Sequence, residues 1–209
     1  MSAAVHPHAS ADQTDLPHVL RAAVKLGILE SVAVLVIGLA TVYLQGAAET
    51  AVVGVLVTLA VLAVTFLPGL WTRPATIEGI AGAAGIGLAA TIVFLIIDVA
   101  LFQPFGLYTN RWREIGGGSN WWYHPIWWMA GTYLPWLGAW MLAARTERGA
   151  APGVGAAAIT LVAATVGCMV LGVVLHVPRA GWNVGTFGVA FLPGLALATI
   201  VSVLGARRK

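Results

Sequence analysis

Long apolar runs that are almost free of charge are the feature that most constrains this chain. The stretch from residue 180 to residue 206, for example, contains no Asp, Glu, Lys or Arg. Only 9% of all residues are charged, whereas about 25% are charged in a typical soluble domain. A run of about 18 or more such residues, coiled as a helix, spans the hydrocarbon layer of a bilayer. We therefore predict an all-α integral membrane protein.

Six membrane spans are predicted, at about residues 26–45, 51–71, 79–103, 121–144, 153–176 and 184–205. They form a single six-helix transmembrane domain over residues 16–209, behind a polar tail over residues 1–15. Asp15 can cap a helix and Pro17 fits its first turn, which predicts a short amphipathic lead-in helix before the first span. The first apolar run is longer than the core of a signal peptide, so we expect it to be retained as a span.

The basic residues predict the orientation. Six spans place both termini on one side, and eight of the eleven Lys and Arg residues then share that side. They are Arg21, Lys25, Arg73, Arg145, Arg148, Arg207, Arg208 and Lys209, against Arg111, Arg113 and Arg179 on the other side. The positive-inside rule places the larger group in the cytoplasm. We therefore expect a multi-pass protein of the cell inner (plasma) membrane, of bacterial type, with both termini inside.

The sequence gives little indication of catalysis. It contains no G-x-S-x-G, H-E-x-x-H, C-x-x-C or phosphate-binding loop motif, so no catalytic residue is predicted. The single cysteine, Cys168, lies in an apolar run, which excludes an internal disulfide and a metal site built on cysteine pairs. The basic residues form no stripe or patch, so nucleic acid is not an expected partner.

Asp98, His124 and His176 are the candidate ligands. Antiparallel spans place them at similar depth in the outer leaflet, at the ends of three predicted helices. Two imidazoles with a carboxylate can hold a transition metal, and the histidines alone can ligate haem or a chlorophyll-type pigment. A carboxylate beside a histidine can also bind a quinone or relay a proton. The spacing matches no strong metal motif, and satisfied interfacial histidines are the simpler interpretation.

Aromatic residues crowd the predicted outer face. The segment from Asn120 to Trp136 reads N-W-W-Y-H-P-I-W-W-M-A-G-T-Y-L-P-W. Aromatic belts at the membrane interface explain part of this excess, and the surplus predicts packing against a partner, a lipid or a flat cofactor. The predicted contact residues are Trp112, Trp121, Trp122, Tyr123, Trp127, Trp128, Arg111 and Arg113.

Two further features concern the spans themselves. Glu30, like Asp98, is a charged residue within a predicted span, and pairing with Lys25 or Arg73 is its simplest explanation. Small residues recur every four positions in the third and fifth spans, which favours close helix association in lipid. These stripes are Ala81, Gly85 and Ala89, and then Ala156, Thr160, Ala164, Cys168 and Gly172.

Three functional hypotheses remain open. The favoured one is a non-catalytic accessory subunit of a larger membrane complex, of respiratory or photosynthetic type, that docks on lipid-embedded partner subunits through small-residue helix faces and the Trp-rich outer surface. The second is a small transporter or channel, although the spans contain few polar residues to line a path. The third is a redox or pigment-binding protein that uses His124 and His176 as ligands.

Overall fold

The computed structural model describes residues 12–108, 123–146 and 153–206, without the side chains of residues 123–125 and 146. Those ranges contain six α-helices and one π-helical turn, and no strand. The helices are α1 (Leu16–Tyr43), α2 (Gly46–Thr72), α3 (Ile77–Ile97), the π-helical turn η1 (Asp98–Phe102), α5 (Tyr123–Thr146), α6 (Val154–Val174) and α7 (Val184–Ala206).

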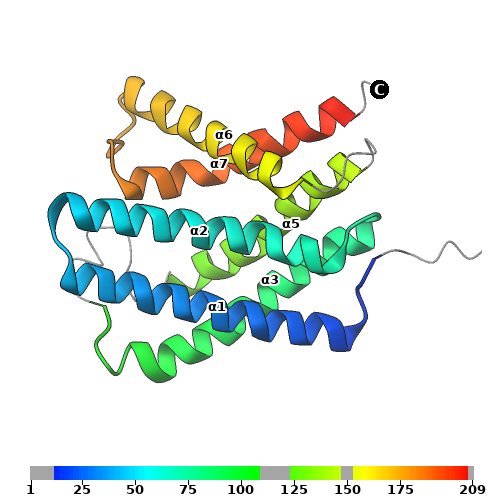
Figure 1. Ribbon diagram of the computed structural model, residues 1–209, viewed down its shortest axis with the longest axis horizontal. Helices are drawn as coiled ribbons and strands as arrows, with labels where there is room; N and C mark the ends of the chain where they lie inside the picture. Colours follow the sequence, from blue (N-terminus) through cyan, green and yellow to red (C-terminus); the bar gives the residue numbers. More distant parts are fainter. Residues whose placement is uncertain (1–11, 109–122, 147–152, 207–209) are drawn as a thin grey trace, which may run out of the picture.

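The helices run up and down as one elongated bundle (Figure 1). Helices α1, α2, α3 and α5 pack as a group of four, α7 packs on α5, and α6 packs chiefly on α7. The start of α1, the turn between α2 and α3, and the ends of α5 and α7 lie at one end of the bundle in Figure 1. Helix α6 is therefore an edge helix whose remaining surface faces outward.

Five helical segments are long and apolar enough to cross a membrane: α1, α2, α3 with η1, α6 and α7. The chain is thus an all-helical, multi-pass membrane protein, as predicted. Helix α5 lies where the fourth span was expected, but it is not among the five. The apolar side chains that the bundle exposes, such as Ile92 and Val201, have the character of a surface solvated by lipid tails.

The expected lead-in helix is not a separate element. One helix, α1, runs without a break from Leu16 to Tyr43, so the amphipathic segment and the first span are continuous. Its start was predicted correctly, because the Asp15 side chain accepts a hydrogen bond of 3.1 Å from the backbone N–H of His18. This bond satisfies one of the free amides of the first helical turn.

Three helix pairs pack in the same way, with a glycine of one helix against a threonine of a neighbouring helix. The pairs are Gly131 (α5) with Thr91 (α3), Gly138 (α5) with Thr65 (α2), and Gly194 (α7) with Thr165 (α6). A Cβ atom on any of these glycines would collide with the threonine side chain or backbone. Each threonine hydroxyl donates to the carbonyl oxygen four residues earlier in its own helix. Close backbone approach, rather than polar contact between helices, therefore joins these pairs.

The small-residue stripe predicted for the third span does not pack within the bundle. Ala81 and Gly85 are exposed, and among the described residues no atom from another part of the chain lies within 4 Å of the position that a Cβ of Gly85 would take. The buried face of α3 instead includes Ala83 and Gly87. Small residues therefore do mediate contacts of α3 within the bundle, but on another face, and helix association through Ala81, Gly85 and Ala89 stays a prediction.

The stripe predicted for the fifth span likewise differs from the buried face of the helix. The buried residues of α6 are Ala157, Leu161 and Thr165, one position along from Ala156, Thr160 and Ala164. Cys168 is half-buried.

A hydrogen-bonded latch fastens the segment before α1 to the start of α3. The Asp12 carboxylate accepts the backbone N–H groups of Ala75 at 2.6 Å and of Thr76 and Gly79 at 3.2 Å each, together with the Thr76 hydroxyl. The backbone N–H of Gln13 donates to the carbonyl oxygen of Thr72 at 2.8 Å. Residues 12–15 were predicted to belong to a polar tail. The chain itself holds them.

Candidate functional site

Asp98 lies at the end of α3 and is fully buried. Its carboxylate accepts the Gln103 side-chain amide at 2.7 Å and the Tyr108 hydroxyl. The chain reaches back to make these bonds because a π-helical turn follows α3, with the backbone N–H of Gln103 bonded to the carbonyl oxygen of Asp98 at 3.0 Å. The Asp98 cluster, comprising Asp98, Gln103 and Tyr108, thus ties the end of α3 to the segment that follows it.

Residues 103–108 fold over the end of the four-helix group. Gly106 adopts a left-handed conformation at φ 67°, which allows the reversal. Leu107 then packs against Gly38 of α1, where a Cβ atom would lie 2.7 Å from the leucine side chain. Because these contacts enclose Asp98, the carboxylate is not open to a ligand from outside. π-Helical turns often mark functional sites, and here the turn shapes the surface beside it.

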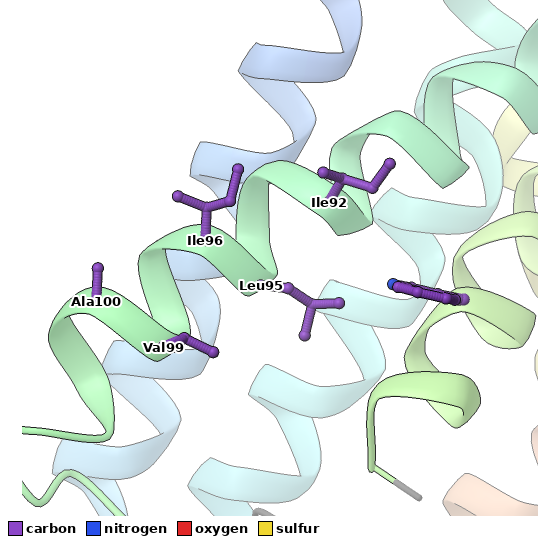
Figure 2. A pocket seen from close by; sticks show the side chains of 6 residues that line it. Ile92, Leu95, Ile96, Val99 and Ala100 are labelled. Atoms are coloured by element: carbon purple, nitrogen blue, oxygen red, sulfur yellow. The ribbon is translucent and has the colours of Figure 1, made fainter. Parts of the chain in front are cut away.

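That surface is an open apolar groove between α3 and α5, with a volume of about 440 Å³. The lining side chains are Ile92, Leu95, Ile96, Val99, Ala100 and Trp128. Figure 2 shows the first five projecting from successive turns at the C-terminal end of α3 and from η1. The groove has almost no polar lining, so it suits a hydrocarbon chain or an apolar helix and offers no group for chemistry.

The groove continues a longer exposed strip along α3. We call this strip the α3 outer face: Ala81, Gly85, Leu88, Ile92 and Ile96. These residues recur every three or four positions and so lie on one side of the helix. In its first half the side chains are short, because the residues are Ala and Gly. In its second half, Ile92 and Ile96 line the groove. The α3 outer face therefore combines small residues, which allow close helix packing, with a groove that can take larger side chains of a neighbouring helix.

The predicted aromatic contact residues have different environments. Trp127 is half-buried, and its ring lies 4.6 Å from that of Phe94 between centroids, so it is a core residue. Trp128 is 50% exposed and lines the groove. Trp112, Trp121, Trp122, Arg111, Arg113 and the side chain of Tyr123 lie outside the described residues.

Two aromatic residues that sequence analysis did not single out also face outward. Trp136 and Trp140 are 41% and 38% exposed, and their rings lie 6.2 Å apart on successive turns of α5. The spacing of four residues was the available signal, because it places two large rings on one side of a helix. Both lie in the second half of α5, beyond the Trp-rich segment at its start.

The candidate metal or cofactor ligands do not form a described cluster. No group of three His, Cys, Asp or Glu side chains in the described ranges is placed to hold a metal ion. The side chain of His124 lies outside the described residues, so its role as a ligand stays a prediction. His176 is exposed just beyond α6, and that helix packs on α7 rather than on α3, which carries Asp98.

His176 has a structural role at the end of α6. Its backbone is left-handed, with φ 53°, and its N–H donates to the carbonyl oxygen of Val173 at 3.1 Å. The next N–H, that of Val177, donates to the carbonyl oxygen of Gly172 at 2.9 Å. This pattern is a Schellman cap, in which glycine usually occupies the position of His176.

Glu30 lies in the middle of α1 and is only 6% exposed. The pairing expected with Lys25 or Arg73 is not formed, since Oε2 of Glu30 has no hydrogen-bond partner among the described residues and both basic side chains are exposed.

Comparison of the chain with known protein families, curated proteins and solved structures gives no match. A functional interpretation therefore has to come from the geometry.

Proposed function

We propose that this protein is a non-catalytic subunit of a larger membrane assembly and that it docks a transmembrane helix of a partner subunit on the α3 outer face. The observation that carries the proposal is the open space above Gly85, which continues into the apolar groove beside Trp128. A helix laid along this strip would meet small residues first and then fill the groove. Trp128, one of the predicted contact residues, would form one wall of the interface.

The way this chain joins its own helices supports the proposal. Gly87, on the opposite side of α3, packs so closely that a Cβ atom would collide with Gly131 and Pro135 of α5. Gly85 also lacks a side chain that would hold a neighbour away, but no other helix lies against it in the part of the chain that the structure describes. Without a hydrophobic driving force in lipid, close packing over small residues is what favours helix association.

The proposed topology has six spans, with α5 as the fourth and both termini in the cytoplasm. Helix α5 has 24 residues, about 36 Å at 1.5 Å per residue, which is long enough to cross. It packs against α2, α3 and α7, and each of these three helices is long and apolar enough to cross a membrane. The bias of eight basic residues against three supports the cytoplasmic placement and the assignment to the cell inner membrane.

Replacement of Gly85 by Leu tests the docking surface. The added side chain fills open space in this chain, so the subunit should fold normally, while a partner helix could no longer approach. We expect the complex extracted in mild detergent to lose this subunit on a native gel, with at least a tenfold drop in the partner protein that co-purifies.

Gly167→Leu is the matched control, because Gly167 of α6 is also exposed with nothing within 4 Å. It should leave assembly unchanged. An unchanged complex with Gly85→Leu would rule out the α3 outer face as the docking surface. Variants of Trp127 or of the residues around Asp12 test docking less cleanly, since Trp127 packs on Phe94 and Asp12 holds α3.

A further inference from the structure

Glu30 is a buried acid on the packed side of α1. It shares that side with Leu26, Gly27, Val34 and Ile37, all of them buried. Apolar clusters lie on both sides of it along the helix, one around Leu26 and the other around Val34. Its carboxyl group is therefore separated from water in both directions.

No charged group faces Glu30 from the helices that pack against α1. From Thr50 to Thr72 in α2 and from Gly79 to Ile97 in α3, the sequence contains no Asp, Glu, His, Lys or Arg. The charged residues of these two helices lie at their ends: Glu49, Glu78 and Asp98. On α1 itself, His18, Arg21 and Lys25 all precede Glu30, and Lys25 is exposed on another face of the helix, five positions away.

A carboxylate without a counter-charge is costly in such a place. Transfer of an unpaired ionised group into an apolar interior costs several kcal/mol or more, so the group keeps its proton instead. A metal ion would not relieve the cost, because calcium or magnesium needs about six oxygen ligands. The adjacent hydroxyl, that of Ser31, already donates to the carbonyl oxygen of Gly27 at 2.8 Å.

We propose that Glu30 is a proton-binding site within the membrane, a neutral carboxylic acid that lipid-soluble reagents can reach and water-soluble ones cannot. Its ligand is the proton alone. The site goes beyond the docking role, because neither the α3 outer face nor the groove involves the packed side of α1. It also makes α1 the helix whose displacement from α2 and α3 would be coupled to loss of a proton.

Infrared spectra of the full chain in lipid at neutral pH test the protonation state directly. Wild-type protein should show the carbonyl stretch of an un-ionised carboxylic acid, and Glu30→Gln should lose that band. Glu78→Gln removes an exposed carboxyl group at the start of α3 and should leave the band unchanged. A wild-type spectrum in which Glu30→Gln removes a carboxylate band instead would overturn the proposal.

Carbodiimide labelling gives a second measurement on the wild-type chain, independent of whether the variant folds. The acid transfers its proton to a carbodiimide nitrogen while its oxygen bonds to the central carbon. The resulting O-acylisourea rearranges to a stable N-acylurea with no leaving group. Dicyclohexylcarbodiimide should modify Glu30, as read by peptide mass spectrometry. A water-soluble carbodiimide should modify Glu78 and spare Glu30. Labelling of Glu30 by the water-soluble reagent, or no labelling by the lipophilic one, would show that the assignment is wrong.

Discussion

At the scale of single residues, Asp98 shows how a buried acidic side chain can stabilise the fold. Its carboxylate is enclosed by the chain and accepts two side-chain hydrogen bonds. Asp98 could be singled out from the sequence, but Gln103 and Tyr108 could not, because both bonds depend on the chain reversing after the helix. The available signals were the five-residue spacing to Gln103, which matches a π-helical bond, and Gly106 in the reversal.

Replacement of Asp98 by Ala is expected to lower the free energy of unfolding by about 1–3 kcal/mol, since buried donors lose their acceptor. Gln103→Ala should cost less, and the double variant should cost less than the sum of the two. Unfolding in detergent, followed by Trp fluorescence, measures all three. Strict additivity would show that the hydrogen bond contributes nothing to stability.

His176 supports a prediction that separates a capping role from a ligand role. Its left-handed backbone costs a non-glycine residue about 1 kcal/mol, so His176→Gly should stabilise the protein by roughly that amount and raise its unfolding temperature. His176→Ala keeps the strain and should not stabilise. If the purified wild-type protein were coloured and both variants lost the colour, His176 would be a cofactor ligand.

At the scale of helices, the sequence predicts the bounds of each helix along the chain better than which side of the helix is buried. The predicted spans at 153–176 and 184–205 differ by at most two residues at either end from α6 and α7. Which side of α3 and α6 is buried in the bundle could not be predicted, because every side of these helices is apolar and periodicity carries no signal. What selects the buried side is the fit of Gly87 and Thr165 against their partners, and that depends on the other helix.

The glycine–threonine crossings make a direct prediction. A Cβ atom on Gly138 would collide with the backbone carbonyl of Thr65, which cannot rotate away, so Gly138→Ala should destabilise the fold by about 1–3 kcal/mol. Gly85→Ala is the comparison, because it meets open space and should raise stability by up to about 1 kcal/mol through helix propensity. Thermal unfolding in detergent measures both. Equal effects would mean that the close crossing is not required.

The Asp12 latch predicts a dependence on pH. Burial alone would raise the pKa of Asp12, but the hydrogen bonds from Ala75, Thr76 and Gly79 together lower it below its usual value. The folded state therefore favours the ionised form, and the latch stabilises the protein at any pH above the ordinary pKa of an Asp. That contribution is lost as the pH falls through the lowered pKa, below about pH 4.

Asp12→Ala should lower the free energy of unfolding by about 1 kcal/mol at neutral pH, the usual value of a capping interaction. The difference from wild type should disappear in acid, because protonated Asp12 binds the amides weakly. Unfolding midpoints from neutral pH to pH 3 check this. A gap between the two proteins that stays constant over the whole range would contradict the assigned role.

At the scale of the whole molecule, the proposed orientation can be tested with introduced cysteines. Cys168 is the one cysteine, so Cys168→Ala provides a clean background. Ala47 in the first turn of α2 and Ala75 in the connection between α2 and α3 are both exposed. The two ends of α2 lie at opposite ends of the bundle (Figure 1). A membrane-impermeant maleimide should label Ala47→Cys in intact cells and Ala75→Cys only after the cells are opened. The reverse pattern would place both termini outside.

The hydrogen bonds between Asp12 and the start of α3 have a consequence for insertion of the chain into the membrane. If only one of α1 and α2 crossed the bilayer, Asp12 and Thr76 would lie on opposite surfaces, where they cannot meet. The contact closes only when both helices have crossed, and it can do so as soon as α3 emerges, before α5 to α7 are made. Closure of this contact would therefore report, early in synthesis, that the first two helices have both been inserted.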